Sequence, residues 1–164
     1  MTDESATPST SQLQAEIGQT RPFGSAAQEA LLGISHTASI LDRVITRALA
    51  PSKISPAQYN VLRILRGAGG AGLPTLAIRC RMIDPSAAIT RLVDKLEEAG
   101  LASRSRASDD RREVRCRITP EGLALLAELD PIMARIEGEV GHELPAAELK
   151  ALIHALDQIR NALE

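Results

Sequence analysis

The sequence predicts a mainly α-helical protein with one small β-hairpin, an α+β fold class. Apolar residues recur at spacings of three and four in several long stretches, which is the periodicity of helices with one buried face. Residues 114–118 instead alternate apolar and charged side chains, the period of two that marks a strand. Phe23 and Tyr59 are the only aromatic residues, so Leu, Ile, Val and Ala must fill the core, a composition that suits helices.

Length and composition narrow the class further. The 164 residues, 24% of them charged, are typical of one globular domain. The polar, acidic start does not resemble a signal peptide, and no run approaches the roughly 18 apolar residues of a membrane span. We therefore expect a cytosolic protein without membrane contact. Cys80 and Cys116 have no metal-ligand spacing, so we expect free thiols, no metal and no cofactor.

The first part of the chain predicts an arm and one long helix. Residues 1–24 are rich in Ser, Thr and Pro and are expected to form a loose arm. The helix ends at Pro51. Its apolar stripe consists of Leu31, Ile34, Ala38, Leu41, Ile45 and Leu49.

A second helix opens with a capping box, in which Ser55 is the N-cap and Gln58 lies three residues later. It is expected to stop at Gly67. Residues 67–72, GAGGAG, formally match the dinucleotide fingerprint G-x-G-x-x-G. That fingerprint requires a strand before the glycines and a β-α-β unit, whereas a helix precedes them here, so we interpret the segment as a turn.

A helix-turn-helix is predicted next, with a short helix over about 74–81 and a stronger one after Asp84. Asp84 is a good N-cap, Pro85 would occupy the first helical position, and Gly100 is placed to end the helix. Small and polar side chains face outward in the first two turns, which would permit close approach of a DNA major groove. The outward positions are Ser86, Ala87, Thr90, Arg91, Asp94 and Lys95.

A hairpin and two helices complete the chain. Residues 101–106 can pair with 114–118, leaving about 107–113 as the tip, and a hairpin that follows a helix-turn-helix makes a winged helix. Thr119 is the N-cap of the next helix, and the last helix follows Pro145. Their apolar stripes exceed what so small a lobe can bury, which favours a homodimer.

The net charge of −2 conceals an asymmetry. Residues 63–117 carry 12 Lys and Arg against 7 Asp and Glu, whereas the rest of the chain carries 7 against 14. This division suggests a surface that faces a polyanion.

Three motifs in order, SPAQYNVLRIL, DPSAAITRLVDKLEEAGL and DDRREVRCRITPEG, resemble the MarR (multiple antibiotic resistance regulator) family of winged-helix transcription factors over about residues 28–162. The resemblance implies a single domain over 25–164. Residues 25–50 and 120–164 would form the dimer and 51–119 the DNA-binding lobe. It also implies a repressor that binds palindromic operators on double-stranded DNA. In the family, a small molecule or an oxidant relieves this repression. For this chain we expect an aromatic or lipophilic small-molecule inducer.

The resemblance also implies roles for individual residues. Asp110 and Arg112, with Arg111 between them, match the D-x-R wing signature, whose Arg enters the minor groove while the Asp orients it. An inserted guanidinium suits the negative potential of a narrow groove. The base-facing positions would be Ser86, Ala87, Thr90 and Arg91. The expected phosphate contacts are Arg79, Arg81, Lys95, Arg104 and Arg106.

The inducer site is less defined. The resemblance places it between the dimer helices and the lobe, so His36 and Tyr59 are candidate lining residues, although side chains of this kind also serve structural hydrogen bonds. Oxidant-sensing members use a Cys near the start of the first long helix, and this chain has none there.

Two alternatives to a DNA-binding regulator remain open. The winged helix could be a protein-interaction module whose basic block meets an acidic partner. An enzyme is the other class, but no carboxylate pair, nucleophile with a histidine or metal cluster is evident, and the three His fall in separate segments. We therefore do not expect an enzyme.

Overall fold

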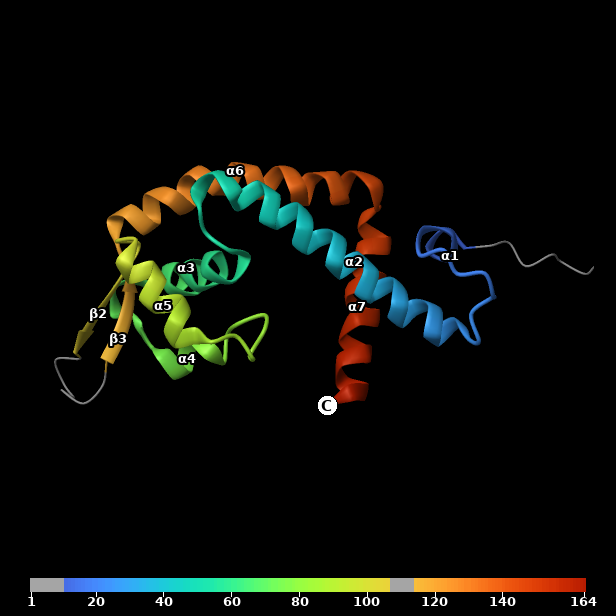
Figure 1. Ribbon diagram of the computed structural model, residues 1–164, viewed down its shortest axis with the longest axis horizontal. Helices are drawn as coiled ribbons and strands as arrows, with labels where there is room; N and C mark the ends of the chain where they lie inside the picture. Colours follow the sequence, from blue (N-terminus) through green and yellow to red (C-terminus); the bar gives the residue numbers. More distant parts are fainter. Residues whose placement is uncertain (1–10, 107–113) are drawn as a thin grey trace, which may run out of the picture. The chain divides into compact units, whose positions relative to one another are not determined.

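The computed structural model describes residues 11–106 and 114–164 and divides into two units, Met1–Val44 and Ile45–Glu164 (Figure 1). In the first unit, the short helix α1 (Gln12–Glu16) lies against the long helix α2 (Ala26–Leu49), which continues into the second unit. Gly33 leaves room for Leu13, and Glu16 Oε2 lies 3.4 Å from His36 Nε2. Part of the segment expected as a loose arm is therefore helical.

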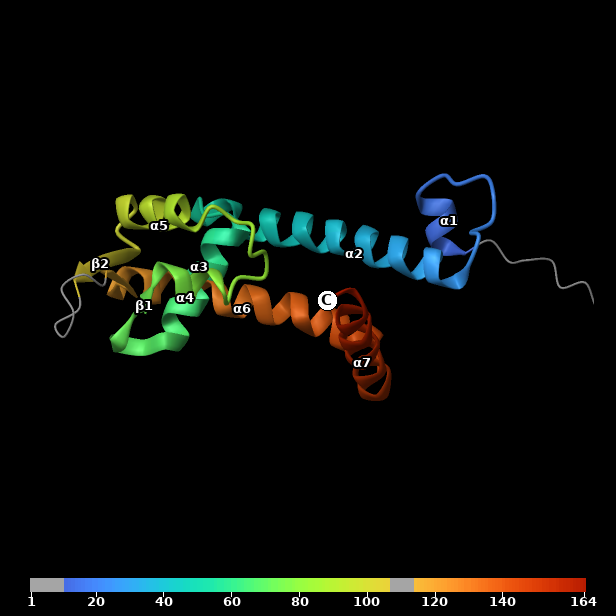
Figure 2. The ribbon, with the colours of Figure 1, turned by 90° about the horizontal axis from the view of Figure 1, so that it is seen from below.

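The second unit contains the helix-turn-helix and the hairpin. Its elements in chain order are a 3-10 turn at Ala50–Ser52, α3 (Pro56–Ala68), a 3-10 turn at Gly69–Ala71, β1 (Leu73–Pro74), α4 (Thr75–Arg79), α5 (Ile89–Glu98), β2 (Ala102–Arg106), β3 (Val114–Ile118), α6 (Pro120–Glu143) and α7 (Ala146–Leu163). Figures 1 and 2 show α3, α4, α5 and the sheet gathered in one lobe, from which α6 leads away to α7.

Local signals explain most helix ends. The capping box of α3 is present, with the Gln58 backbone N–H donating to Ser55 Oγ at 3.2 Å and the Ser55 N–H donating to Gln58 Oε1 at 2.9 Å. Thr119 Oγ1 accepts the Gly122 N–H at 3.1 Å and caps α6. These predictions are confirmed, and α3 runs one residue past its expected end at Gly67.

The sheet has three antiparallel strands in the order β1-β3-β2. The two strands of the predicted hairpin pair as expected, and the register sets Ala102 opposite Ile118 and Arg106 opposite Val114. The third strand, β1, was not predicted, because two residues carry no readable period; it pairs with β3 through Leu73 and Cys116. Gly72, at φ +64°, allows the glycine-rich turn to approach β3 closely. A Cβ at this position would lie 2.6 Å from the Cys116 carbonyl oxygen.

One core fills the lobe, and α3 runs through its centre. The fully buried side chains come from α2, α3, α4, α5, β3 and α6: Leu49, Val61, Leu62, Leu65, Ile78, Val93, Leu96, Cys116, Leu126 and Leu129. Beyond this core, α6 and α7 keep large apolar side chains exposed. They are Leu123, Val140, Leu152, Ile153 and Leu163.

The expected start of α5 is wrong. The helix begins at Ile89, not at Pro85, and its N-cap position is Ala88. Asp84 does not cap the helix because its Oδ1 accepts both the Ser86 N–H at 2.9 Å and the Ser86 hydroxyl at 2.6 Å. An Asp side chain that bonds two residues ahead stabilises a turn, so residues 84–88 form a turn in place of the expected first helical turn.

Candidate nucleic-acid interface

The candidate interface is built on α4, α5 and the turn between them. The hydrogen bonds from Ser86 lower the pKa of Asp84, so this carboxylate stays ionised and holds the turn. The far end of α5 closes in a Schellman motif, in which the Gly100 N–H donates to the Glu97 carbonyl at 2.9 Å and the Leu101 N–H to the Leu96 carbonyl at 2.8 Å. Gly100, at φ +70°, therefore ends α5 as predicted.

Helix α5 presents three different faces. Ile89, Val93 and Leu96 are buried against the lobe. Thr90, Asp94 and Glu97, at spacings of four and three, form a second stripe that lies toward β2. Arg91, Lys95 and Glu98 are exposed on the third face.

A single arginine joins the hairpin to the second stripe. Arg104 on β2 places Nη1 at 2.6 Å from Asp94 Oδ1 and at 2.9 Å from Glu97 Oε2. Its Nη2 donates to the Thr90 carbonyl at 3.3 Å, and its backbone N–H donates to Glu97 Oε1 at 3.0 Å. Partial burial works against this charge, but the bonds to Asp94 and Glu97 outweigh it and raise the guanidinium pKa.

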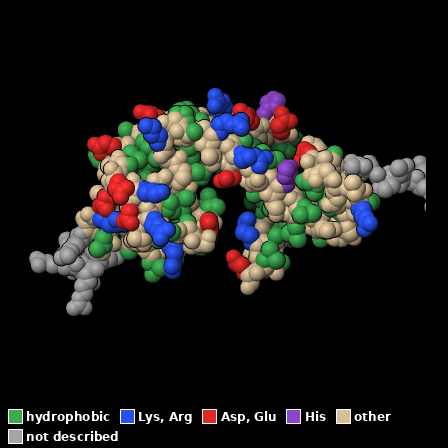
Figure 3. Space-filling model, in the orientation of Figure 1, with side chains coloured by type: hydrophobic (Ala, Val, Ile, Leu, Met, Phe, Trp, Pro, Cys, Tyr) green, Lys and Arg blue, Asp and Glu red, His purple; other side chains and the backbone are tan. Residues whose placement is uncertain are grey.

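Several of the predicted DNA contacts come from α4, the turn after it and the first half of α5. α4, the start of α5 and the strand ends that lead to the tip lie on the lower side of the lobe in Figure 1, and Lys and Arg side chains are prominent there in Figure 3. The exposed members are Arg79, Arg81, Ser86, Thr90, Arg91 and Lys95. Ala87 is half-buried, and Arg106 ends β2. Asp110, Arg111 and Arg112 lie outside the described residues.

Two further arginines hold the lobe together. Arg117 on β3 donates from Nε to the Gly70 carbonyl at 2.8 Å and from Nη1 to the Ser105 hydroxyl, so the cationic face of the strand is partly occupied within the protein. Arg66 on α3 forms a double hydrogen bond with Asp130 on α6, at 3.1 and 2.8 Å. The sequence does not predict either pairing, because the partners lie 47 and 64 residues apart.

The candidate inducer residues fall in different units. His36 contacts Glu16 in the first unit. Tyr59 is buried in the second unit, with the Arg63 guanidinium 5.8 Å from its ring centre, and burial raises the pKa of its hydroxyl. Both stay predictions as ligand contacts.

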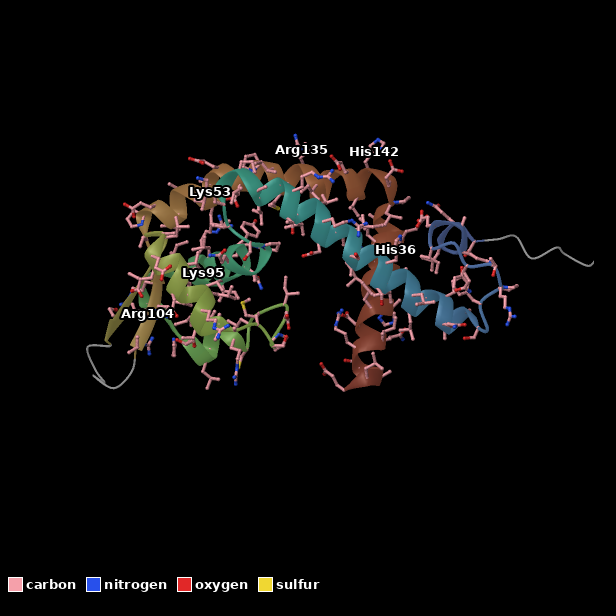
Figure 4. All side chains as sticks on the ribbon, in the orientation of Figure 1. His36, Lys53, Lys95, Arg104, Arg135 and His142 are labelled. Carbon is pink, nitrogen blue, oxygen red and sulfur yellow. The ribbon has the colours of Figure 1, made fainter. Side chains whose placement is uncertain are left out.

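An open pocket of about 740 Å³ lies within the second unit, between the start of α3 and the end of α5. Lys53 and Gln58 line one side, and Lys95 of α5 lines another; Figure 4 labels the two lysines. Sequence reasoning missed this pocket, because its lining residues come from three separate stretches of the chain, 52–58, 95–101 and Leu125.

Comparison with known proteins decides the family. The family model for MarR matches residues 54–114, from just before α3 to the first residue of β3. The crystal structure of a MarR transcription factor from Planctomyces limnophilus is 36% identical and matches with a TM-score of 0.61, covering 84% of this chain and 99% of that one. The chain belongs to the MarR family.

Two other relatives of this MarR-family chain extend the comparison. The HTH-type transcriptional regulator PecS of Dickeya dadantii is 34% identical over 95 residues, so the match spans 57% of each chain. The MarR C80S variant from E. coli complexed with operator DNA shares the fold, with 24% identity, a TM-score of 0.68 and coverage of 91% of this chain and 99% of that one. Among the helices of residues 11–106 and 114–164, none is long and apolar enough to cross a membrane.

Proposed function

We propose that this MarR-family protein is a DNA-binding transcription regulator that represses from palindromic operators as a homodimer. One observation carries the proposal: the start of α5, where Thr90 and Arg91 are exposed, lies on the same side of the lobe as α4 and the strand ends of the hairpin. A helix fits the major groove while an adjacent hairpin reaches the backbone or the minor groove.

The chemistry of the first turn supports this docking. None of the described side chains caps the N-terminus of α5, so N–H groups of its first turn remain available to a phosphate. Arg91 can donate two hydrogen bonds to a guanine edge, the commonest specific base contact. Arg79, Arg81 and Lys95 are exposed cations suited to phosphates, which fix the register of the complex. Asp110, Arg111 and Arg112 of the wing would add the minor-groove contact.

The homodimer rests on exposed apolar surface. Leu152 and Ile153 of α7 are 45% and 58% exposed, and Val140 of α6 is 42% exposed. A second copy would bury such side chains, and two lobes related by a twofold axis read half-sites about 34 Å apart. The E. coli relative that was crystallised with operator DNA supports the same use of the fold.

Release by a small molecule is the remaining part of the proposal. BpsR of Bordetella bronchiseptica, which shares the fold, is described as regulated in DNA binding by 6-hydroxynicotinic acid. The pocket that Lys53 and Lys95 line offers a place for such control, because an occupant would touch α5 directly. His36 and Tyr59 stay the alternative candidates for ligand contact.

Selection of bound fragments from the source genome, followed by footprinting, tests the proposal. We expect one recurrent inverted repeat whose affinity falls by orders of magnitude between about 50 and 200 mM salt while its preference over other duplexes persists. Arg91→Ala should weaken binding to that repeat by about 1–3 kcal/mol. Arg135→Ala, which removes the same charge from the exposed side of α6, is the matched control and should change little. Absence of any sequence preference would refute the proposal and favour a protein-interaction module.

A further inference from the structure

Arg104 was expected to contact a DNA phosphate, but its surroundings indicate another role. Its side chain is 24% exposed, whereas Asp94 and Glu97 are 46% and 42% exposed. Two carboxylates against one guanidinium leave this cluster with a net negative charge. A phosphate would therefore meet a surface that repels it, and Arg104 would have to give up both partners to reach the DNA.

The four contacts of Arg104 instead define the placement of α5. They reach Thr90, Asp94 and Glu97, which span about two turns of the helix along its side. Glu97 is held twice, by the guanidinium and by the backbone N–H of the same arginine. A planar guanidinium with several fixed donors restricts rotation more than a point charge does. The contacts therefore fix both the distance of α5 from β2 and its rotation about its own axis.

Rotation of α5 matters for recognition because its faces carry different groups. Arg91 and Lys95 each follow a residue of the stripe that Arg104 holds, so the helical repeat puts them on the neighbouring face. A small rotation would move the Arg91 guanidinium away from a base edge, whereas phosphate contacts tolerate it, since they depend mainly on charge.

We propose that Arg104 is a positioning residue that locks α5 against β2 and thereby controls discrimination between operator and other DNA. This inference rests on the proposed function. Arg104 acts through Asp94 and Glu97 and leaves base and phosphate contacts to other side chains. Overall charge attraction for DNA does not depend on it.

Glu97→Ala provides a test in which the two roles predict opposite results. If Arg104 were a phosphate contact, losing Glu97 would free its charge, strengthen binding to every duplex and steepen the dependence of log affinity on log salt by about 0.9. As a positioning residue, Arg104 instead loses its hold on α5. The ratio of affinities for the selected operator and for a shuffled duplex of equal composition should then fall about three- to ten-fold.

Glu128→Ala is the matched control, because Glu128 carries the same charge and is exposed but lies on α6, outside the proposed DNA contacts. It should leave the affinity ratio unchanged. Arg104→Gln should lower the affinity ratio as Glu97→Ala does and leave the salt slope as in the parent. The double variant with Arg104→Gln and Glu97→Ala should lower the ratio no further than either single variant does. A slope that falls by about 0.9 in Arg104→Gln with an unchanged ratio would overturn the proposal.

Amide hydrogen exchange of the DNA-free protein separates this proposal from the function on which it rests. Glu97→Ala should speed exchange in α5 and β2 but not in α3, and Glu128→Ala should leave exchange in all three elements unchanged. Unchanged exchange in α5 overturns the positioning role whatever the DNA result. If α5 loosens as expected but the parent shows no preference among duplexes, the proposed function fails, and the role in discrimination fails with it.

Discussion

Gly122 is a helical residue at which replacement by alanine should destabilise the protein. Inside a helix this exchange usually gains up to about 1 kcal/mol, because alanine is the better helix former. At Gly122, however, a Cβ would lie 2.3 Å from the Leu101 carbonyl oxygen and 2.8 Å from Ile118 Cγ1. The carbonyl cannot turn away cheaply, because it accepts the Thr119 N–H at 3.2 Å and follows directly on the end of α5.

The magnitude follows from these contacts. Adding a side-chain atom to a well-packed site costs about 1–3 kcal/mol in folding free energy. The alanine Cβ at position 122 would overlap the fixed Leu101 carbonyl oxygen, so we expect a cost at the upper end of that range. After the gain in helix propensity, we expect Gly122→Ala to lower the free energy of unfolding by about 2 kcal/mol. In a protein of this size that corresponds to a fall of about 4–8 °C in the midpoint of thermal unfolding.

Gly138→Ala is the control in the same helix, since no atom lies within 4 Å of the position that its Cβ would occupy. Urea unfolding followed by circular dichroism should show Gly138→Ala equal to or more stable than the parent and Gly122→Ala less stable. Equal stability of Gly122→Ala and the parent would refute the reasoning. It would mean that the junction of α5, β3 and α6 adjusts without cost.

Three other predictions follow from single sites. Ser55→Ala removes the capping box of α3 and should cost about 0.5–2 kcal/mol by urea unfolding; no loss would contradict the role of the cap. The hydrogen bond from Arg66 lowers the pKa of Asp130. The stability that the ionised Asp130 carboxylate contributes through this pair is therefore complete above the ordinary Asp pKa, and it is lost as pH falls through the lowered pKa. Below about pH 4, Asp130→Asn should therefore approach the parent in urea midpoint, whereas an undiminished difference there would contradict the assignment. A thiol reagent should modify exposed Cys80 in the folded protein and reach buried Cys116 only after unfolding, which mass spectrometry can check; early labelling of Cys116 would indicate an open lobe.

Local sequence signals determined most of the secondary structure. The stripe that ends at Leu49, the capping box at Ser55, the N-cap at Thr119 and the glycine at position 100 each act within a few residues, so they can be read without knowing the fold. The alternation over 114–118 likewise predicted a strand, because a strand with one buried face alternates apolar and polar side chains. The charge asymmetry suggested a surface that faces a polyanion, and this stays a prediction.

Tertiary structure decided what depends on groups far apart in the chain. Only the folded lobe shows that β1 pairs with β3, that Gly122 faces the Leu101 carbonyl, and that Arg104 holds α5. The start of α5 was ambiguous even locally, because Asp84 can cap a helix or close a turn, and the sequence contains both options. The physical reason is common to all these cases. Helix caps and apolar periodicity depend on residues that are close in the sequence. The partner of a carboxylate or a carbonyl, and the space around a glycine, depend instead on which distant atoms the folded chain brings within reach.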